Sequence, residues 1–222
     1  MREHLPRRFD LIVFDWDGTL FDSTALIVRC IQAACADLGL PVPDARRAAY
    51  VIGLGLHDAL RHAVPDLPPE QYPELGRCYR AHYLPMQHEL ELFPGAVEML
   101  LALKNRRHRI GVASGKSRRG LDEALRTAGL DRMFDATRAA DETAGKPDPR
   151  MLLELMAELG AEPARTLMIG DTTHDLQLAK NAGTGCVGVT YGAHEGSAIA
   201  ALAPLHVAHS LADLAAWLEA HA

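Results

Sequence analysis

Two aspartates, Asp15 and Asp17, stand directly after the largely apolar run at 9–14, and Gly18 follows them. In an extended strand, residues two apart face the same side, so the two carboxylates point the same way. Close like charges repel, and removing a carboxylate from water is costly unless a cation or hydrogen bonds compensate. A divalent cation is the simplest compensation. The motif therefore predicts a metal-assisted site where this strand ends, a usual place for ligands in open α/β folds.

Two more polar groups lie at similar positions. Ser114, Gly115 and Lys116 follow a strand predicted at 110–113, and Lys146 comes just before a predicted helix. Because the carboxyl ends of neighbouring parallel strands meet at one edge of a sheet, such groups can come together in space.

A second pair of acids, Asp171 and Asp175, follows the strand predicted at 166–169. Their spacing of four residues places both carboxylates on one face of a helix, close to its N-terminus. Helix N-terminal acids are common in their own right. An acid directly after an apolar strand, as Asp171 is, favours a functional site instead.

Together these groups fit phosphoryl transfer. A carboxylate nucleophile needs a positioned phosphorus, a cation that screens the repulsion between anions, and donors around the phosphoryl oxygens. The Ser114 hydroxyl, backbone amides and the Lys146 ammonium can be those donors. Asp17 can protonate the leaving alkoxide and later activate water. Mg²⁺ prefers hard oxygen ligands, which three acids can supply: Asp15, Asp171 and Asp175.

The order of these residues resembles the haloacid dehalogenase-like (HAD) hydrolases, in their phosphatase branch. The matching motifs are Asp-x-Asp-Gly-Thr-Leu at 15–20, a Ser ending the second core strand, a Lys before a helix, and Gly-Asp-(x)3-Asp at 170–175. One such motif is weak evidence, but four in order over nearly the whole chain are strong. The chain length and the position of a helical insertion are similar to those of phosphoglycolate phosphatase-like proteins.

The resemblance implies a role for each matched residue. Asp15 would be the nucleophile that becomes an aspartyl-phosphate. Asp17 would be the general acid and then the base, with its backbone carbonyl in the metal shell. Thr19 would orient Asp17 and its loop, while Ser114 and the amide of Gly115 would bind the phosphoryl group.

The remaining matches concern charge and metal. Lys146 would pair with the charges of the nucleophile and the phosphoryl group, Asp171 would bind Mg²⁺ directly, and Asp175 would bind it directly or through water. Many relatives have Asn where this chain has Gly115, so a side-chain amide is lost while a backbone donor remains. Lys116 either compensates as a substrate contact or is a solvated lysine.

The predicted elements divide the chain into two parts. Only helices are expected between about 22 and 90, whereas strands and helices alternate afterwards, which predicts a doubly wound parallel sheet. We therefore expect an α/β, Rossmann-like core formed by residues 1–20 and 91–222, with a helical cap at 21–90. Strands are expected at 9–14, 110–113, 134–137, 166–169, 185–189 and 206–208, and helices at 22–38, 44–50, 54–63, 69–88, 95–106, 118–128, 149–159, 173–182 and 211–220.

Three smaller features carry expectations of their own. Asp22 or Ser23 can cap the first helix. The glycine-bracketed turn at 53–55 is either an ordinary loop or a segment that dips toward the site. His174, inside the fourth motif, is expected to face solvent.

The overall composition excludes several classes of protein. A net charge of −6 argues against general nucleic-acid binding. No apolar stretch is long enough to span a bilayer, and residues 1–8 lack the apolar region of a secretion signal. None of the four cysteines forms a Cys-x-x-Cys pair, which favours reduced, mostly buried thiols in a cytoplasmic protein over zinc or disulfides: Cys30, Cys35, Cys78 and Cys186.

The sequence thus predicts a Mg²⁺-dependent phosphatase for a small soluble phosphomonoester, such as phosphoglycolate or a sugar phosphate. A closed cap would exclude water and leave no room for a bulky protein substrate. A phosphomutase of β-phosphoglucomutase type and a pyrophosphatase remain open, while Asp17 speaks against a dehalogenase or a phosphonatase. A phospho-acceptor module resembling response-regulator receivers is a different class, and it usually lacks a large insertion. The oligomeric state is left open.

Overall fold

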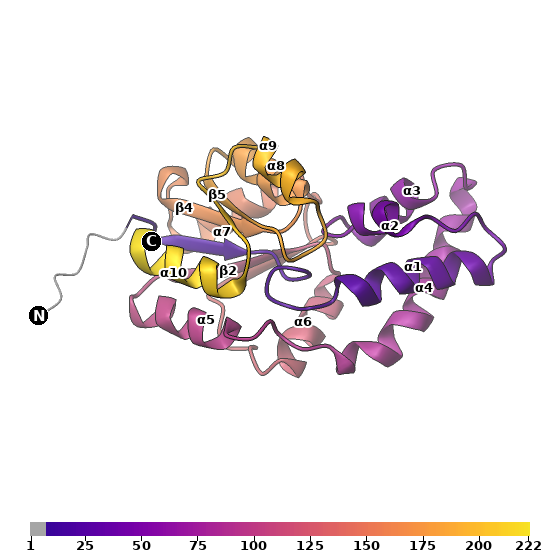
Figure 1. The fold of residues 1–222 in the computed structure, drawn as a ribbon, viewed down its shortest axis with the longest axis horizontal. Helices are drawn as coiled ribbons and strands as arrows, with labels where there is room; N and C mark the ends of the chain where they lie inside the picture. Colours follow the sequence, from indigo (N-terminus) through magenta and orange to yellow (C-terminus); the bar gives the residue numbers. More distant parts are fainter. Residues whose placement is uncertain (1–7) are drawn as a thin grey trace, which may run out of the picture.

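A computed structural model describes residues 8–222 of the chain (Figure 1). Its strands form one parallel sheet in the order β3-β2-β1-β4-β5-β6, which confirms the expected doubly wound fold. The expectation about a secretion signal concerns residues 1–8 and lies, apart from Arg8, outside the described part. The strands are β1 (Leu11–Phe14), β2 (Arg109–Ser114), β3 (Ala136–Ala139), β4 (Thr166–Gly170), β5 (Gly185–Val189) and β6 (His206–Ala208).

Both faces of the sheet are covered by helices. Ile12 and Phe14 of β1 point to one face, and Leu11 and Val13 point to the other; all four are fully buried. This explains why β1 is an unbroken apolar run without alternation. The first face packs against α5 (Ala96–Asn105), α6 (Arg118–Thr127) and α10 (Leu211–His221), and the second against α7 (Arg150–Leu159), α8 (Thr173–Ala182) and α9 (Gly196–Ala201).

Between β1 and β2 the chain forms helices only. They build a separate apolar cluster that includes Leu26, Leu60 and Leu75, and we call residues 24–89 the helical insertion. Figure 1 shows the insertion beyond the end of the sheet toward which the β1 arrow points. Its helices are α1 (Thr24–Asp37), α2 (Ala45–Tyr50), α3 (Leu56–Ala63) and α4 (Tyr72–Met86), with 3₁₀ turns η1 (Pro69–Gln71) and η2 (Gln87–Glu89); a third 3₁₀ turn, η3 (Pro163–Arg165), precedes β4.

The two connections to the helical insertion run side by side. Phe21 and Leu92 form an antiparallel bridge, and the backbone N–H of Asp22 donates to the carbonyl of Glu91 at 2.9 Å. The chain therefore leaves the sheet and returns to it at one place.

The structure differs from the expected elements by one helix and by several bounds; β1, α1 and α3, for example, begin two residues later than expected. The short helix α9, with only Ile199 buried, was not expected because its Gly-Ser-Ala-Ile-Ala-Ala sequence has little apolar periodicity. Strand β3 begins two residues later than expected, because Asp135 pairs with the backbone of Ile110 at its start. The helix expected at 69–88 is α4 flanked by the turns η1 and η2. None of the helices in the described part has both the length and the apolar character that crossing a membrane requires.

Candidate active site

The sheet brings the two pairs of predicted acids together. Strands β1 and β4 are neighbours, and the chain continues from β1 to β2 on the other side, so the strand order reverses here. Ligands of open α/β sheets commonly bind at such a reversal. The backbone N–H of Asp15 donates to the carbonyl of Ile169 at 2.8 Å. Carboxylate oxygens of Asp15, Asp171 and Asp175 lie within 4.8 Å of one another, and each residue is at most 1% exposed.

Gly18 allows the first motif to turn against the second. Its φ of +80° is a conformation that residues with a side chain rarely adopt. A Cβ atom at this position would also lie 2.2 Å from Oδ2 of Asp171. The glycine is therefore required both by the backbone and by the acid that faces it.

Lys146 is the cation at the centre of the buried acids. Its Nζ lies 2.5 Å from Oδ1 of Asp15 and 2.7 Å from Oδ1 of Asp175, and its side chain is fully buried. Burial alone would lower the pKa of Lys146, but the two carboxylates outweigh burial and raise the pKa above its usual value. Lys146 therefore stays charged and offsets one of three buried negative charges.

Polar neighbours fix the other two acids. The Thr19 hydroxyl donates to Oδ1 of Asp171 at 2.9 Å, so Thr19 holds this acid rather than the side chain of Asp17. The backbone N–H of Ala193 donates to the second oxygen of Asp171 at 2.7 Å. Thr172 donates its hydroxyl and its N–H to Oδ2 of Asp175 at 2.6 and 3.1 Å, in the capping box that begins α8.

Two carboxylate oxygens in this group accept no hydrogen bond from the described residues. They are Oδ2 of Asp15 and Oδ1 of Asp175, and the latter faces only the Lys146 ammonium. Burial raises the pKa of Asp15 well above its usual value, and burial together with the charge of Asp175 raises the pKa of Asp171 to about 7. Buried hard oxygen donors with excess negative charge fit Mg²⁺.

Asp17 lies on the open side of this group and has partners of its own. Its Oδ1 accepts the Ser23 hydroxyl at 2.6 Å and lies 3.1 Å from Nζ of Lys116. Lys116 also donates to the Tyr83 hydroxyl of α4 at 2.9 Å. The alternative of a solvated Lys116 is wrong, since its side chain is only 13% exposed and links Asp17 to the helical insertion. Burial lowers the pKa of Lys116, but Asp17 and Tyr83 outweigh it and the pKa lies above its usual value.

Sequence reasoning missed the contact of Ser23 with Asp17. Ser23 does precede α1, as expected of a cap, yet its side chain makes no capping hydrogen bond. A hydroxyl directly before a helix usually caps that helix. The sequence therefore predicts a cap at Ser23 and not its hydrogen bond to Asp17.

The structure leaves no room for a side chain at Gly115. A Cβ atom on it would lie 2.5 Å from the carbonyl oxygen of Leu54 and 2.6 Å from that of Gly53. The turn at 53–55 thus lies directly on Gly115. It is therefore a segment that dips toward the site and not an ordinary loop, and it lines the cavity described below. Ser114 beneath it is fully buried, and its hydroxyl accepts the N–H of Lys116 at 3.1 Å.

His174 does not face solvent, so that expectation is wrong. Its Nε2 lies 2.8 Å from the backbone carbonyl of Tyr50, the last residue of α2, and only 8% of the residue is exposed. His194 places its Nε2 2.9 Å from the same carbonyl and stacks on the Tyr50 ring. Nδ1 of His194 accepts the N–H of Thr173, so Nε2 carries the proton and donates to Tyr50. The sequence near His174 cannot reveal this contact, because its partner lies in the helical insertion.

A cavity of about 410 Å³ lies between the sheet edge and the helical insertion. Asp17, Gly115 and Lys116 line it from the core, and Arg80 adds a second permanent cation. Asp15 does not line the cavity and lies behind Asp17. The insertion contributes mainly apolar side chains: Ile27, Ile31, Val51, Ile52, Leu54, Tyr79, Tyr83 and Leu84.

Known proteins share both this sequence and this fold. A family model described as haloacid dehalogenase-like hydrolase matches residues 12–189. A probable phosphatase, IndB of Dickeya dadantii, is 38% identical over 92% of this chain and 91% of its own. A phosphoglycolate phosphatase of Synechococcus elongatus is 30% identical over 91% of this chain and 94% of its own. The crystal structure of a hydrolase from Pseudomonas syringae superposes with a TM-score of 0.87 at 25% identity. The match covers 95% of this chain and 98% of that one.

These matches define the class of the protein. The chain belongs to the haloacid dehalogenase-like hydrolases. Within that family it is similar to the phosphoglycolate phosphatase-like enzymes, as the motifs indicate.

The raised pKa of Asp171 predicts a pH-dependent stability of the metal-free protein. The ordinary pKa is 3.8 and the folded value is about 7, so between these values the folded state binds more protons. The free energy of unfolding therefore falls as the pH rises through this window. Denaturant titrations in chelator at about pH 5 and about pH 8 should show a smaller loss for Asp171→Asn than for the wild type.

Mg²⁺ should raise the stability of the wild type more at the higher pH, where the acids are ionised. His174 and His194 have lowered pKa values, mainly through burial. Their protonation lowers the free energy of unfolding at low pH, to the same extent in both proteins. If the free energy of unfolding had the same pH dependence in the wild type and in Asp171→Asn, the titration of Asp171 would not be its cause.

The contact beneath the turn at 53–55 predicts the effect of a single methyl group. Gly115→Ala should displace the carbonyls of Gly53 and Leu54, at a cost on the order of 1–3 kcal/mol for overpacking. Gly129→Ala is the less crowded comparison, since a Cβ there meets no atom within 4 Å, although its φ of +68° adds backbone strain. Chemical denaturation measures the loss of stability in each variant. A phosphate-release assay should show that only Gly115→Ala impairs turnover. Unchanged turnover would mean that the turn does not shape the site.

Proposed function

We propose that this chain is a Mg²⁺-dependent phosphatase that hydrolyses a small phosphomonoester through an aspartyl-phosphate on Asp15. The observation that carries the proposal is the buried group of three carboxylates and one lysine, in which Oδ2 of Asp15 accepts no hydrogen bond from the described residues. Asp15, Asp171, Asp175 and the backbone carbonyl of Asp17 would hold the ion. Bound there, Mg²⁺ supplies positive charge that screens the repulsion between Asp15 and the phosphate.

Asp15 and Asp17 divide the chemistry in this proposal. Asp15 attacks phosphorus with Oδ2, the oxygen that no donor occupies, and the bond to the leaving oxygen breaks as Asp17 gives that oxygen a proton. In the second half, Asp17 takes a proton from water, the water oxygen attacks phosphorus, and the bond to Asp15 breaks. Inorganic phosphate leaves, and both aspartates return to their starting state.

The neighbouring groups bind and orient. Ser114, the amide of Gly115 and Lys116 would contact the phosphoryl oxygens, while Thr19 holds Asp171. Lys146 keeps Asp15 in place and offsets its charge, as its 2.5 Å contact supports.

The helical insertion would serve as the cap, with the domain division 1–20 and 91–222 against 21–90. Asp15 is 1% exposed, so a substrate reaches it only when the insertion moves away. The paired connections at Phe21 and Leu92 are suited to act as the hinge. The size of the cavity, about 410 Å³, suits a small ester such as phosphoglycolate or a sugar phosphate, and Lys116 and Arg80 would contact its charged groups beside three acids of the lining, Asp17, Asp58 and Asp141. Four free cysteines suit a cytoplasmic reaction.

The first test is the release of inorganic phosphate from small esters, with Mg²⁺ and with chelator. The panel contains phosphoglycolate, sugar phosphates, pyrophosphate and an aryl phosphate. We expect Mg²⁺-dependent turnover that Asp15→Asn lowers more than about 10³-fold, with circular dichroism unchanged. Turnover retained in Asp15→Asn would remove Asp15 as the nucleophile.

The same panel separates the other reactions. Release from pyrophosphate alone would favour a pyrophosphatase, and transfer between sugar positions without release would favour a mutase. A single phosphorylation of Asp15 without turnover would favour a phospho-acceptor module. Each of these outcomes would overturn the phosphomonoesterase proposal.

The acid role of Asp17 predicts a dependence on the leaving group. Asp17→Asn should slow alkyl phosphates by about 10²–10⁴-fold, because their leaving oxygen needs a proton, and should slow aryl phosphates less. Asp22→Asn is the matched control, an exposed acid in the same segment whose substitution should leave both rates unchanged. Equal losses for alkyl and aryl esters would contradict the acid role.

A further inference from the structure

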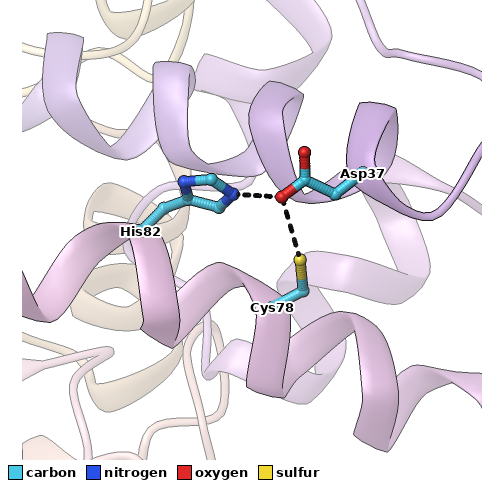
Figure 2. Close-up of side chains that lie close together, drawn as sticks. All are labelled: Asp37, Cys78 and His82. Atoms are coloured by element: carbon cyan, nitrogen blue, oxygen red, sulfur yellow. Dashed lines mark hydrogen bonds and ion pairs between the residues drawn. The ribbon is translucent and has the colours of Figure 1, made fainter.

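A second group of potential metal ligands lies on the outer face of the helical insertion. Asp37 ends α1, and Cys78 and His82 stand one turn apart on the facing helix α4 (Figure 2). Oδ2 of Asp37 lies 2.7 Å from Nε2 of His82 and 3.7 Å from Sγ of Cys78. The three ligand atoms all lie within 4.8 Å of one another, so one ion can contact all three.

We propose that Asp37, Cys78 and His82 form a Zn²⁺ site that joins α1 to α4. Carboxylate, thiolate and imidazole are the three side-chain ligands that Zn²⁺ commonly takes in proteins, at about 2.0–2.3 Å. Figure 2 shows the three side chains converging on one point between the helices. The side chains of His82 and Asp37 are 35% and 56% exposed, so the ion can enter from solvent and keep water as a fourth ligand.

The electrostatics of the group favour a cation. Asp37 places a negative charge at the C-terminus of α1, where the helix dipole is also negative. When Zn²⁺ binds, the Zn–S bond forms as the thiol of Cys78 gives its proton to solvent.

In the sequence, only the spacing of Cys78 and His82, four residues apart, hints at this site, because the third ligand is distant. A search for zinc motifs relies on ligands close together in the chain, such as Cys-x-x-Cys, whereas Asp37 and Cys78 are 41 residues apart. Only the packing of α1 on α4 brings them together.

The position of the site links it to the cavity. Tyr79 and Tyr83 each follow one of the α4 ligands in sequence, stack on each other and line the cavity. Ile27 and Ile31 line it from α1. An ion between α1 and α4 would therefore fix the two helices whose other sides form the cavity wall.

Cobalt binding followed by absorption tests the site without measuring activity. The reduced, metal-free full chain is titrated with Co²⁺ in excess Mg²⁺, which keeps the carboxylate site at the sheet edge filled. Only a ligand with a thiolate gives the sulfur-to-cobalt charge-transfer band. We expect this band in the wild type, its loss when one equivalent of Zn²⁺ is added, and a Zn²⁺-dependent rise in Tm.

Matched variants identify the ligands. Cys78→Ser should abolish the band, and His82→Gln should weaken binding more than about 100-fold, since even outer partners of a metal ligand change affinity by about 10- to 100-fold. Cys35→Ala, a buried thiol of α1, and His88→Gln, an exposed histidine of the insertion, should retain it.

Three results would contradict the Zn²⁺ site. A folded wild type without the band, a band that survives Cys78→Ser, or an equal rise in Tm in the wild type and His82→Gln would overturn the proposal. If circular dichroism shows that Cys78→Ser is unfolded, Asp37→Asn provides the same test at an exposed position, and unchanged binding there is equally contrary.

Discussion

Asp15, Asp171 and Asp175 share with Lys146 a volume from which water is almost excluded, and three carboxyl groups face one ammonium there. Buried carboxylates are costly unless they are paired or ligate a cation. The surrounding structure limits this cost: hydroxyls and amides occupy some of the oxygens, and Gly18 leaves room for Asp171. The arrangement is stable only as part of the whole sheet, because Asp15 lies more than 100 residues before the other three members in the chain.

A second constraint is the contact between core and helical insertion. Lys116 joins Asp17 to Tyr83, and His174 and His194 both approach the carbonyl of Tyr50. These hydrogen bonds stand beside the stacking of His194 on Tyr50 and differ from the apolar clusters within each part. In the proposed opening of the cap, water can replace these hydrogen-bond partners.

Much of the site could be predicted from sequence because parallel topology leaves little choice. Once 9–14 and 166–169 are recognised as buried parallel strands, Asp15 and Asp171 must lie at the same edge. The buried position of His174 could not be predicted, because it depends on Tyr50, which lies 124 residues away in the chain. The same holds for Gly115, whose lack of a side chain makes sense only with the turn at 53–55 above it.

The errors in secondary structure have a related physical cause. Helix α9 is short and rich in small residues, so its formation depends on the burial of Ile199 against β5 rather than on local propensity. Elements and acids that follow a clear strand pattern can be predicted, whereas α9 and His174 depend on distant partners that no local pattern indicates.

The paired connections at Phe21 and Leu92 have an implication for the history of the molecule. A segment that enters and leaves a scaffold at one point can be exchanged, lengthened or trimmed without changing the register of any strand. The part of the chain that carries the aspartates and the helical insertion that lines the cavity can then evolve at different rates. Such modularity allows one chemistry to be inherited while its choice of substrate is revised.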